Sequence, residues 1–257
     1  MKQKTVSVLP CFNNGTCIYW LVKEVKRFVD EVVVVDDGSK DETASLAEKA
    51  GAKVIKIELN KGKANAVRVG IDYALKKLNA SLIITHLDCD YEHEPSDIKR
   101  LKQAYEPKNL VIGKRKYNGK LDVRSFVYRW LQDLLKEKLN LFVADPLCGF
   151  RLFNKHFAEL LLLYSKAEGF GLELEEILLA DRLDYKIKEV QLSTFFKQKW
   201  HDLDGSRIRN EIQDNVKVIL QYQKELNLSK AEVEDIQYGF FGLIKELSPY
   251  TLNSALT

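Results

Sequence analysis

The sequence has few cysteines and almost no net charge, and each shortage argues against a class of protein. Its four cysteines among 257 residues form no C-x-x-C pair and no zinc-like spacing, so we expect reduced thiols and no disulfide framework. Lys and Arg number 40 against 37 Asp and Glu, which leaves a net charge of +3 and no general attraction to nucleic acid. Anionic ligands must therefore bind at local sites.

Long apolar runs are also missing. No window reaches the roughly 18 uncharged apolar residues of a membrane-spanning helix. No signal-peptide core precedes the first strand expected, at Thr5–Leu9. A G-x-S-x-G elbow and a Walker A loop are absent as well, which argues against those hydrolase and nucleotide-binding classes. We expect a cytoplasmic protein that contacts a membrane only peripherally, on its cytoplasmic face.

What the sequence does contain is an alternation of short β-branched runs with segments of helical period. The run Val32–Val35 is apolar throughout, which indicates a strand buried on both faces of a parallel sheet. We expect an α/β fold with a Rossmann-like, mostly parallel sheet and helices on both faces in residues 1–207, and a C-terminal helical extension in residues 208–257. The expected strands are Thr5–Leu9, Glu31–Val35, Lys53–Glu58, Ser81–Leu87, Leu110–Ile112 and Lys186–Leu192. The expected helices are near Gly15–Phe28, Glu42–Ala50, Lys63–Leu78, Pro95–Tyr105, Asp122–Leu141 and Leu172–Leu183, and from Ile208 to the end.

Acidic residues follow two of the expected strands. Ligands of such sheets bind beyond the carboxyl ends of the strands, so these positions are candidates for a site. Asp36 and Asp37 fit hydrogen bonds from a nucleotide, although an ordinary turn explains them equally well. Asp88, Asp90 and Glu92 alternate on an extended segment, so their carboxylates can converge on one hard cation. The alternative for this segment is a polar loop, or a His/Asp metal site of the hydrolase kind.

Basic residues form the complementary set. The stretch Asn60–Ala64 opens a helix whose backbone N–H groups favour an anion, unless it is only a solvated basic turn. Arg115, Arg124 and Arg129 follow a strand and continue into a helix. Guanidinium groups there would suit phosphate oxygens, because they stay charged and bind in a bidentate way; surface solubility is the alternative.

Taken in order, these segments resemble glycosyltransferase family two, with its GT-A fold, and within it the polyprenyl-phosphate mannose and glucose synthases. Val35–Asp41 is similar to V-D-D-G-S-x-D and Asn60–Arg68 to N-x-G-K-x-x-A-x-R. Asp88–Pro95 resembles D-A-D-x-Q-H-x-P, Gly113–Arg115 matches G-x-R, and Asp145–Arg151 resembles the D-x-x-x-G-F-R of the polyprenyl-phosphate branch. The matching segments extend over about Thr5–Ser206.

The resemblance implies an inverting, metal-dependent transfer of a hexose from GDP-mannose or UDP-glucose to polyprenyl (dolichyl) phosphate. The implied nucleotide-sugar site consists of Pro10, Phe12, Asn13, Asp36, Asp37, Gly38, Ser39, Asn60, Lys63 and Asp88. Mg²⁺ or Mn²⁺ would be held by Asp88, Asp90 and Glu92, and the acceptor phosphate by Arg115, Arg124 and Arg129. The implied catalytic residues are Asp88, Asp90, Arg115, Arg124 and Asp145.

Some positions depart from the family pattern, and other functions stay open. Glu92 replaces the usual Gln and adds negative charge at the metal motif, and Asp184 replaces the usual Gly. The alternatives are a family-two enzyme with a saccharide or small-molecule hydroxyl acceptor, a nucleotidyltransferase, and a non-catalytic nucleotide-sugar-binding protein. The apolar patch around Phe240-Phe241 suits either a membrane surface or packing within a homo-oligomer.

Overall fold

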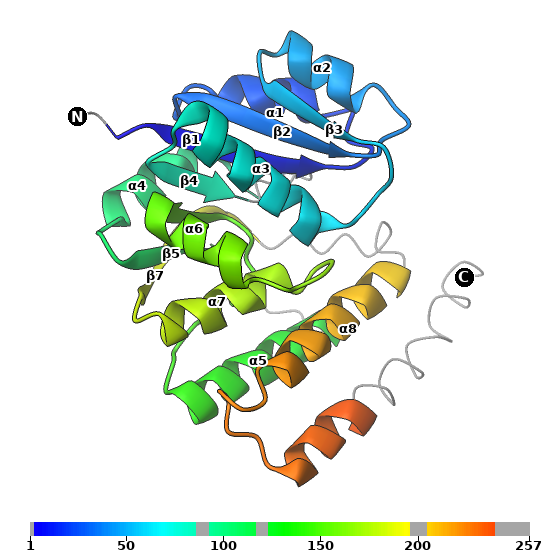
Figure 1. Ribbon diagram of the computed structural model, residues 1–257, viewed down its shortest axis with the longest axis vertical. Coiled ribbons are helices and arrows are strands. Elements are labelled where there is room, and N and C mark those ends of the chain that lie inside the picture. Colours follow the sequence, from blue (N-terminus) through cyan, green and yellow to red (C-terminus); the bar gives the residue numbers. More distant parts are fainter. Residues whose placement is uncertain (1–2, 86–92, 117–122, 196–204, 240–257) are drawn as a thin grey trace.

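A single sheet organises the chain. The computed structural model describes residues 3–85, 93–116, 123–195 and 205–239. Seven strands form the sheet, in the order β3-β2-β1-β4-β6-β5-β7 (Figure 1). They are β1 (Thr5–Cys11), β2 (Glu31–Asp37), β3 (Lys53–Ile57), β4 (Leu82–Thr85), β5 (Asn109–Lys116), β6 (Arg151–Asn154) and β7 (Lys186–Phe195). The helices are α1 (Ile18–Val25), α2 (Thr43–Lys49), α3 (Lys63–Leu78), the 3-10 helix η1 (Pro95–Asp97), α4 (Ile98–Ala104), α5 (Val123–Leu139), α6 (Lys155–Tyr164), α7 (Leu172–Arg182) and α8 (Gly205–Gln221).

The sheet is parallel except at β6, which runs antiparallel to both of its neighbours, β4 and β5. Helices cover its two faces, so the side chains of Val32–Val35 in β2 are at most 1% exposed. α3 packs on β1, β2 and α6, and Figure 1 shows α3 and α6 side by side in front of the sheet. The predicted α/β fold with a mostly parallel sheet is therefore confirmed.

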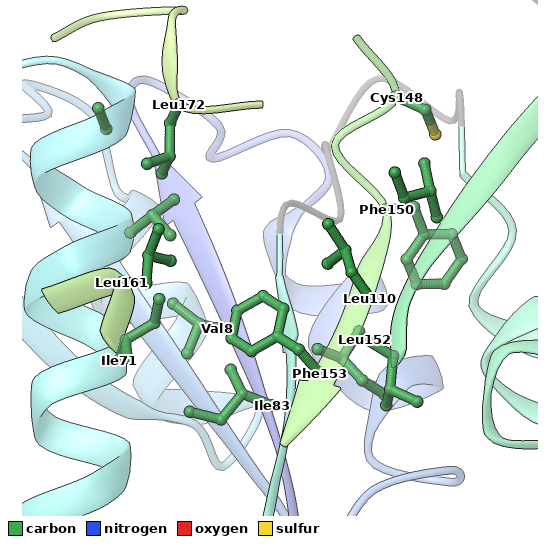
Figure 2. Packing of buried hydrophobic residues seen from close by; sticks show 14 of the residues in the cluster. Val8, Ile71, Ile83, Leu110, Cys148, Phe150, Leu152, Phe153, Leu161 and Leu172 are labelled. Carbon is green, nitrogen blue, oxygen red and sulfur yellow. The ribbon is translucent and has the colours of Figure 1, made fainter. Parts of the chain in front are cut away.

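β6 and α6 were not predicted from the sequence; β6 begins at Arg151, the last residue of the D-x-x-x-G-F-R motif, and α6 follows it directly. Figure 2 shows Phe153 of β6 on the side of the sheet where Ile71 of α3 and Leu161 of α6 lie, while Leu152 points to the other side. The strand has four residues and begins with the fully buried Arg151, so neither its length nor its polarity marks it as a core strand.

Within the described residues, the C-terminal part that was expected to be helical from Ile208 contains two helices. Turns and coil follow α8 over residues 222–229, and a second helix covers residues 230–239. A capping box opens it: Ser229 N–H donates to Oε2 of Glu232 (2.9 Å) and Glu232 N–H donates to Oγ of Ser229 (3.3 Å). Nζ of Lys138 on α5 lies 2.5 Å from Oε1 of Glu232 and fixes this helix to α5.

The division at residues 207/208 stays a prediction; α8 begins at Gly205. None of the helices described here is long and apolar enough to span a bilayer.

Candidate active site

The loops that leave β1 and β2 meet at the carboxyl edge of the sheet. Pro10 lies near the end of β1, and beyond it the backbone N–H of Asn13 donates to Oγ of Ser39 (2.8 Å). Oδ1 of Asn13 accepts the N–H of Lys40 (3.0 Å). Asn13 has a φ of 55°, a left-handed conformation that Asn tolerates better than most residues. The ring of Phe12 is 46% exposed beside this junction, so an apolar surface is accessible there.

The two carboxylates at the end of β2 have different surroundings. Oδ1 of Asp37 accepts the N–H of Lys61 (2.9 Å) and Oδ2 accepts the N–H of Gly62 (2.8 Å), so Asp37 fixes the turn before α3. Oδ1 of Asp36 accepts the N–H of Ser39 (2.9 Å). Both side chains are largely buried, at 6% exposure for Asp36 and 4% for Asp37. Both oxygens of Asp37 are thus engaged by backbone N–H groups, whereas one oxygen of Asp36 is.

Several polar groups at the start of α3 bind other parts of the protein. Gly38 has a φ of +83°, and a Cβ there would lie 2.9 Å from the backbone N of Asn60, so this crossing of two turns requires glycine. Nζ of Lys63 lies 2.8 Å from Oε1 of Glu173, and the N–H of Ala64 donates to a carbonyl in the loop before α7 (3.0 Å). Together with the amides of Lys61 and Gly62 that bind Asp37, this means that three N–H groups of the stretch Asn60–Ala64 are engaged by the protein itself.

On the other side of the site, Arg115 and Asp145 form a buried, bidentate ion pair. Nε of Arg115 lies 2.8 Å from Oδ2 of Asp145, and Nη2 lies 2.9 Å from Oδ1. Nη2 also donates to the hydroxyl of Tyr128 on α5 (2.6 Å). Arg115 is 7% exposed and Asp145 5% exposed. Both oxygens of Asp145 therefore accept bonds from Arg115, which makes Asp145 an ion-pair partner and leaves a general base role dependent on breaking the pair.

An irregularity in the sheet directs Arg115 to this position. Lys114 of β5 pairs with Gln191 of β7, but Lys116 pairs with Phe195, so the register shifts opposite Arg115. The backbone N–H of Arg115 donates to Oδ2 of Asp145 (3.1 Å) instead of to β7. One carboxylate thus satisfies both the main chain and the side chain of Arg115.

A second buried arginine fixes the loop that carries Asp145. Arg151 is 0% exposed, and its guanidinium donates to the carbonyls of Pro146 (2.7 Å), Cys148 (2.9 Å) and Glu173 (2.5 Å). Nη1 also pairs with Oε2 of Glu176 (3.0 Å). The D-x-x-x-G-F-R motif is therefore a loop folded around its own last residue.

Electrostatics at Arg115 favour a permanent positive charge. Burial acts to lower the pKa of Arg115, but the charge and hydrogen bonds of Asp145 outweigh it and raise that pKa well above its usual value. Burial, followed by the charge of Asp145, raises the pKa of the Cys148 thiol to about 12, which excludes a thiolate nucleophile at neutral pH. Nε2 of His93 lies 3.7 Å from Sγ of Cys148, and its ring packs on Phe150.

Several predicted site residues lie outside the described residues. Asp88, Asp90 and Glu92 fall in the gap between Thr85, the last residue of β4, and His93. Within the described ranges, no cluster of three or more His, Cys, Asp or Glu side chains is arranged to hold a metal ion.

The two remaining arginines lie on α5. Arg124 belongs to this helix, although its side chain is outside the described set. Arg129 is exposed. It follows Tyr128 directly in α5, so its side chain points about 100° away from that of Tyr128 around the helix axis. Tyr128 was not among the predicted site residues. It lies four residues after Arg124, and this helical spacing, which places the two residues on one face of α5, could have indicated it.

Comparison with known proteins places the chain in a family. Residues 7–161 match the profile of glycosyl transferase family 2. A dolichyl-phosphate beta-glucosyltransferase of Drosophila melanogaster is 30% identical over 71% of this chain, which spans 59% of that protein's length. An uncharacterised protein of Methanocaldococcus jannaschii is 30% identical over 77% of this chain and 84% of its own length.

The fold is similar to that of solved structures. Glucosyl-3-phosphoglycerate synthase of Mycobacterium tuberculosis, solved in complex with UDP, has a TM-score of 0.68 and 23% identity over 89% of this chain and 82% of its own. The GT-A prediction is thereby confirmed. The family match begins within β1 and ends within α6, so it includes the loops after β1 and β2, Arg115 and Asp145. The chain is a glycosyltransferase that belongs to glycosyl transferase family 2.

Proposed function

We propose that this glycosyltransferase transfers glucose from UDP-glucose to a polyprenyl phosphate of the dolichyl type, with inversion at the anomeric carbon. The observation that carries the proposal is the buried fork of Arg115 on Asp145 at the carboxyl edge of the sheet. A guanidinium held in this way keeps its charge and its orientation, which suits a phosphate acceptor better than a neutral hydroxyl.

A phosphate acceptor simplifies the chemistry that the residues must perform. The second pKa of a phosphate monoester is about 6, so the acceptor is already a nucleophile at neutral pH and needs no protein base. This agrees with an Asp145 whose two oxygens are engaged by Arg115. Arg115, and by our proposal Arg124 and Arg129, would orient the phosphate for in-line attack on the sugar.

The donor assignment rests on the relatives. Dolichyl-phosphate beta-glucosyltransferases of Drosophila melanogaster, Dictyostelium discoideum and Saccharomyces cerevisiae are 26–30% identical to this chain. The Mycobacterium tuberculosis enzyme of similar fold was solved with UDP. We assign the nucleotide to the junction of the β1 and β2 loops, where the exposed ring of Phe12 would stack on a base and Asp36 would accept a bond from the base or ribose. GDP-mannose is the alternative donor.

We assign a divalent cation to the segment after β4. Asp88, Asp90 and Glu92 would supply the hard oxygen ligands that Mg²⁺ and Mn²⁺ prefer. Thr85, the last residue of β4, pairs with Val8 of β1, so β4 ends beside the strand that leads into the proposed nucleotide site. Structures of the similar synthase contain Mg²⁺ or Mn²⁺ together with UDP. A bound cation supplies positive charge for the departing diphosphate.

The acceptor's location implies contact with a bilayer. A polyprenyl phosphate is met at a membrane surface, so we propose peripheral association on the cytoplasmic face, whether as a monomer or a homo-oligomer. Flotation of the full chain with dolichyl-phosphate vesicles tests this contact; a protein that stays at the bottom of the gradient contradicts it.

An assay of two sugar donors against three acceptors tests the proposed activity. UDP-glucose and GDP-mannose are each offered with a short polyprenyl phosphate, the matching polyprenol and 3-phosphoglycerate, in Mg²⁺ and in Mn²⁺. We expect transfer only from UDP-glucose to the polyprenyl phosphate, with a β-linked product by NMR. Transfer to the polyprenol or to 3-phosphoglycerate would instead establish a hydroxyl acceptor.

A further inference from the structure

A carboxylate on β7 holds the segment that carries Asp145. Oε1 of Glu189 accepts the backbone N–H of Ala144 (2.9 Å) and that of Asp145 (3.0 Å). Two consecutive amides directed at one charged oxygen fix the plane of the peptide between them. The position of the Asp145 main chain is therefore set by a side chain 44 residues further along the sequence.

The same peptide is held from the opposite side. Nε2 of Gln132 on α5 donates to the carbonyl of Ala144 (2.6 Å). Gln132 lies four residues after Tyr128, so the two share a face of α5, and Tyr128 accepts a bond from Arg115. Segment 144–145 is thus bound to both β7 and α5 before its carboxylate reaches Arg115.

We propose that Glu189 is a positioning residue for the acceptor phosphate: it sets Asp145, and Asp145 sets the guanidinium of Arg115. This inference rests on the proposed role of Arg115. Asp145 receives three bonds from Arg115, at 2.8, 2.9 and 3.1 Å, so a shift of the Asp145 backbone moves the guanidinium with it. Bidentate groups tolerate little displacement, and an error of about 1 Å in positioning costs as much as a hundredfold in rate.

Groups other than the Glu189 side chain hold β7 in the sheet. β7 is paired with β5 from Asn109↔Lys186 onward. It is also tied to η1 through Asp97, which accepts the N–H of Ser193 (2.6 Å) and its hydroxyl (2.8 Å). Glu189 is half-buried and contributes no side chain to the apolar core. Its loss should therefore act on the acceptor site more than on folding.

The test separates acceptor binding from donor binding in Glu189→Ala, Glu189→Asp and Glu189→Gln, with Lys188→Ala on the same strand as the control. We expect Glu189→Ala to raise KM for a short polyprenyl phosphate about tenfold, because charge-assisted hydrogen bonds are lost. Glu189→Asp keeps the charge but retracts it by one methylene and should also raise KM. Glu189→Gln keeps an acceptor oxygen and should recover most of the loss. UDP-glucose affinity by calorimetry should stay within about twofold in all of them.

Two results overturn the inference: an unchanged acceptor KM in Glu189→Ala, or a parallel fall in donor affinity. If Glu189→Ala does not fold, an unchanged acceptor KM in Glu189→Asp also overturns the inference. Arg115→Lys in the same assay isolates the proposed function. A normal acceptor KM in Arg115→Lys removes the phosphate role of Arg115 itself, whereas a raised one beside a normal Glu189→Ala removes only the role of Glu189. In the double variant that combines Glu189→Ala with Arg115→Lys, the increase in acceptor KM should be smaller than the product of the two single increases, because both substitutions act through one guanidinium.

Discussion

Asp36 and Asp37 are adjacent in the chain, but only Asp37 commits both of its oxygens to backbone N–H groups, whereas Asp36 commits one. We therefore expect Asp37→Ala to lower the free energy of unfolding by about 1.5–3 kcal/mol, the contribution of hydrogen bonds to a charged group. Asp36→Ala should weaken UDP-glucose binding about tenfold or more and change stability less. Urea denaturation and calorimetry of both variants check this. Equal effects of the two variants on donor affinity would contradict the division.

The second prediction concerns the proposed metal ligands. Asp88 and Asp90 repel each other unless a cation lies between them, so metal and nucleotide binding should be coupled. Asp90→Ala should abolish turnover, and chelation followed by Mg²⁺ or Mn²⁺ should abolish and restore it in the unaltered protein. Glu92→Gln, which introduces the usual family residue and keeps a ligand oxygen, should reduce turnover less than Asp90→Ala does. An Asp90→Ala protein with near-normal turnover in chelator would refute the assignment.

The third prediction follows from the contact between α5 and the helix at residues 230–239. The hydrogen bond from Lys138 and those from Ser229 lower the pKa of Glu232 to about 2. A lowered folded-state pKa means that the contact contributes fully above the usual Glu pKa of about 4.3 and is lost as pH falls toward 2. A ¹³C NMR titration of the Glu232 carboxyl should give a midpoint near 2, and Lys138→Met should raise it. A midpoint near 4 in the unaltered protein would show that the contact does not persist in solution.

The sequence placed Asp36 and Asp37 correctly at the end of a buried strand, because the signals for that strand and turn are local. The apolar run of β2 and the acidic turn after it lie within a few residues of each other, and strand ends mark the ligand edge of a parallel sheet. The same local pattern did not distinguish Asp36 from Asp37. That difference depends on where Lys61 and Gly62 lie, 24 and 25 residues away from Asp37.

The acceptor side was less predictable, because its contacts are long-range. Arg115 and Asp145 are separated by 30 residues and by all of α5, and no periodicity pairs them. Arginine is a residue type usually found at the surface. Arg151 is buried because three carbonyls and the carboxylate of Glu176 bind its guanidinium. Charged residues inside a core are therefore where reading from periodicity fails, and here they surround the proposed acceptor site.

The last prediction separates a phosphate acceptor from a hydroxyl acceptor through Arg115. Lysine keeps the positive charge but cannot span both oxygens of Asp145, so Arg115→Lys should retain donor affinity and lose about ten- to a hundredfold in kcat/KM for the polyprenyl phosphate. Arg115→Ala should lose more, and it should also unfold more readily, by about 3–5 kcal/mol, because it leaves Asp145 as an unpaired buried charge. Arg129, which is exposed, provides a comparison. If the buried guanidinium of Arg115 binds the acceptor phosphate, Arg129→Ala should reduce kcat/KM less than Arg115→Lys does. For each variant, initial rates over a range of acceptor concentrations give kcat/KM for the acceptor. Calorimetry gives the affinity for UDP-glucose, and urea denaturation gives the free energy of unfolding. If donor affinity collapses in Arg115→Lys while the acceptor's KM is unchanged, Arg115 serves the leaving diphosphate, and a hydroxyl acceptor becomes the better description of the reaction.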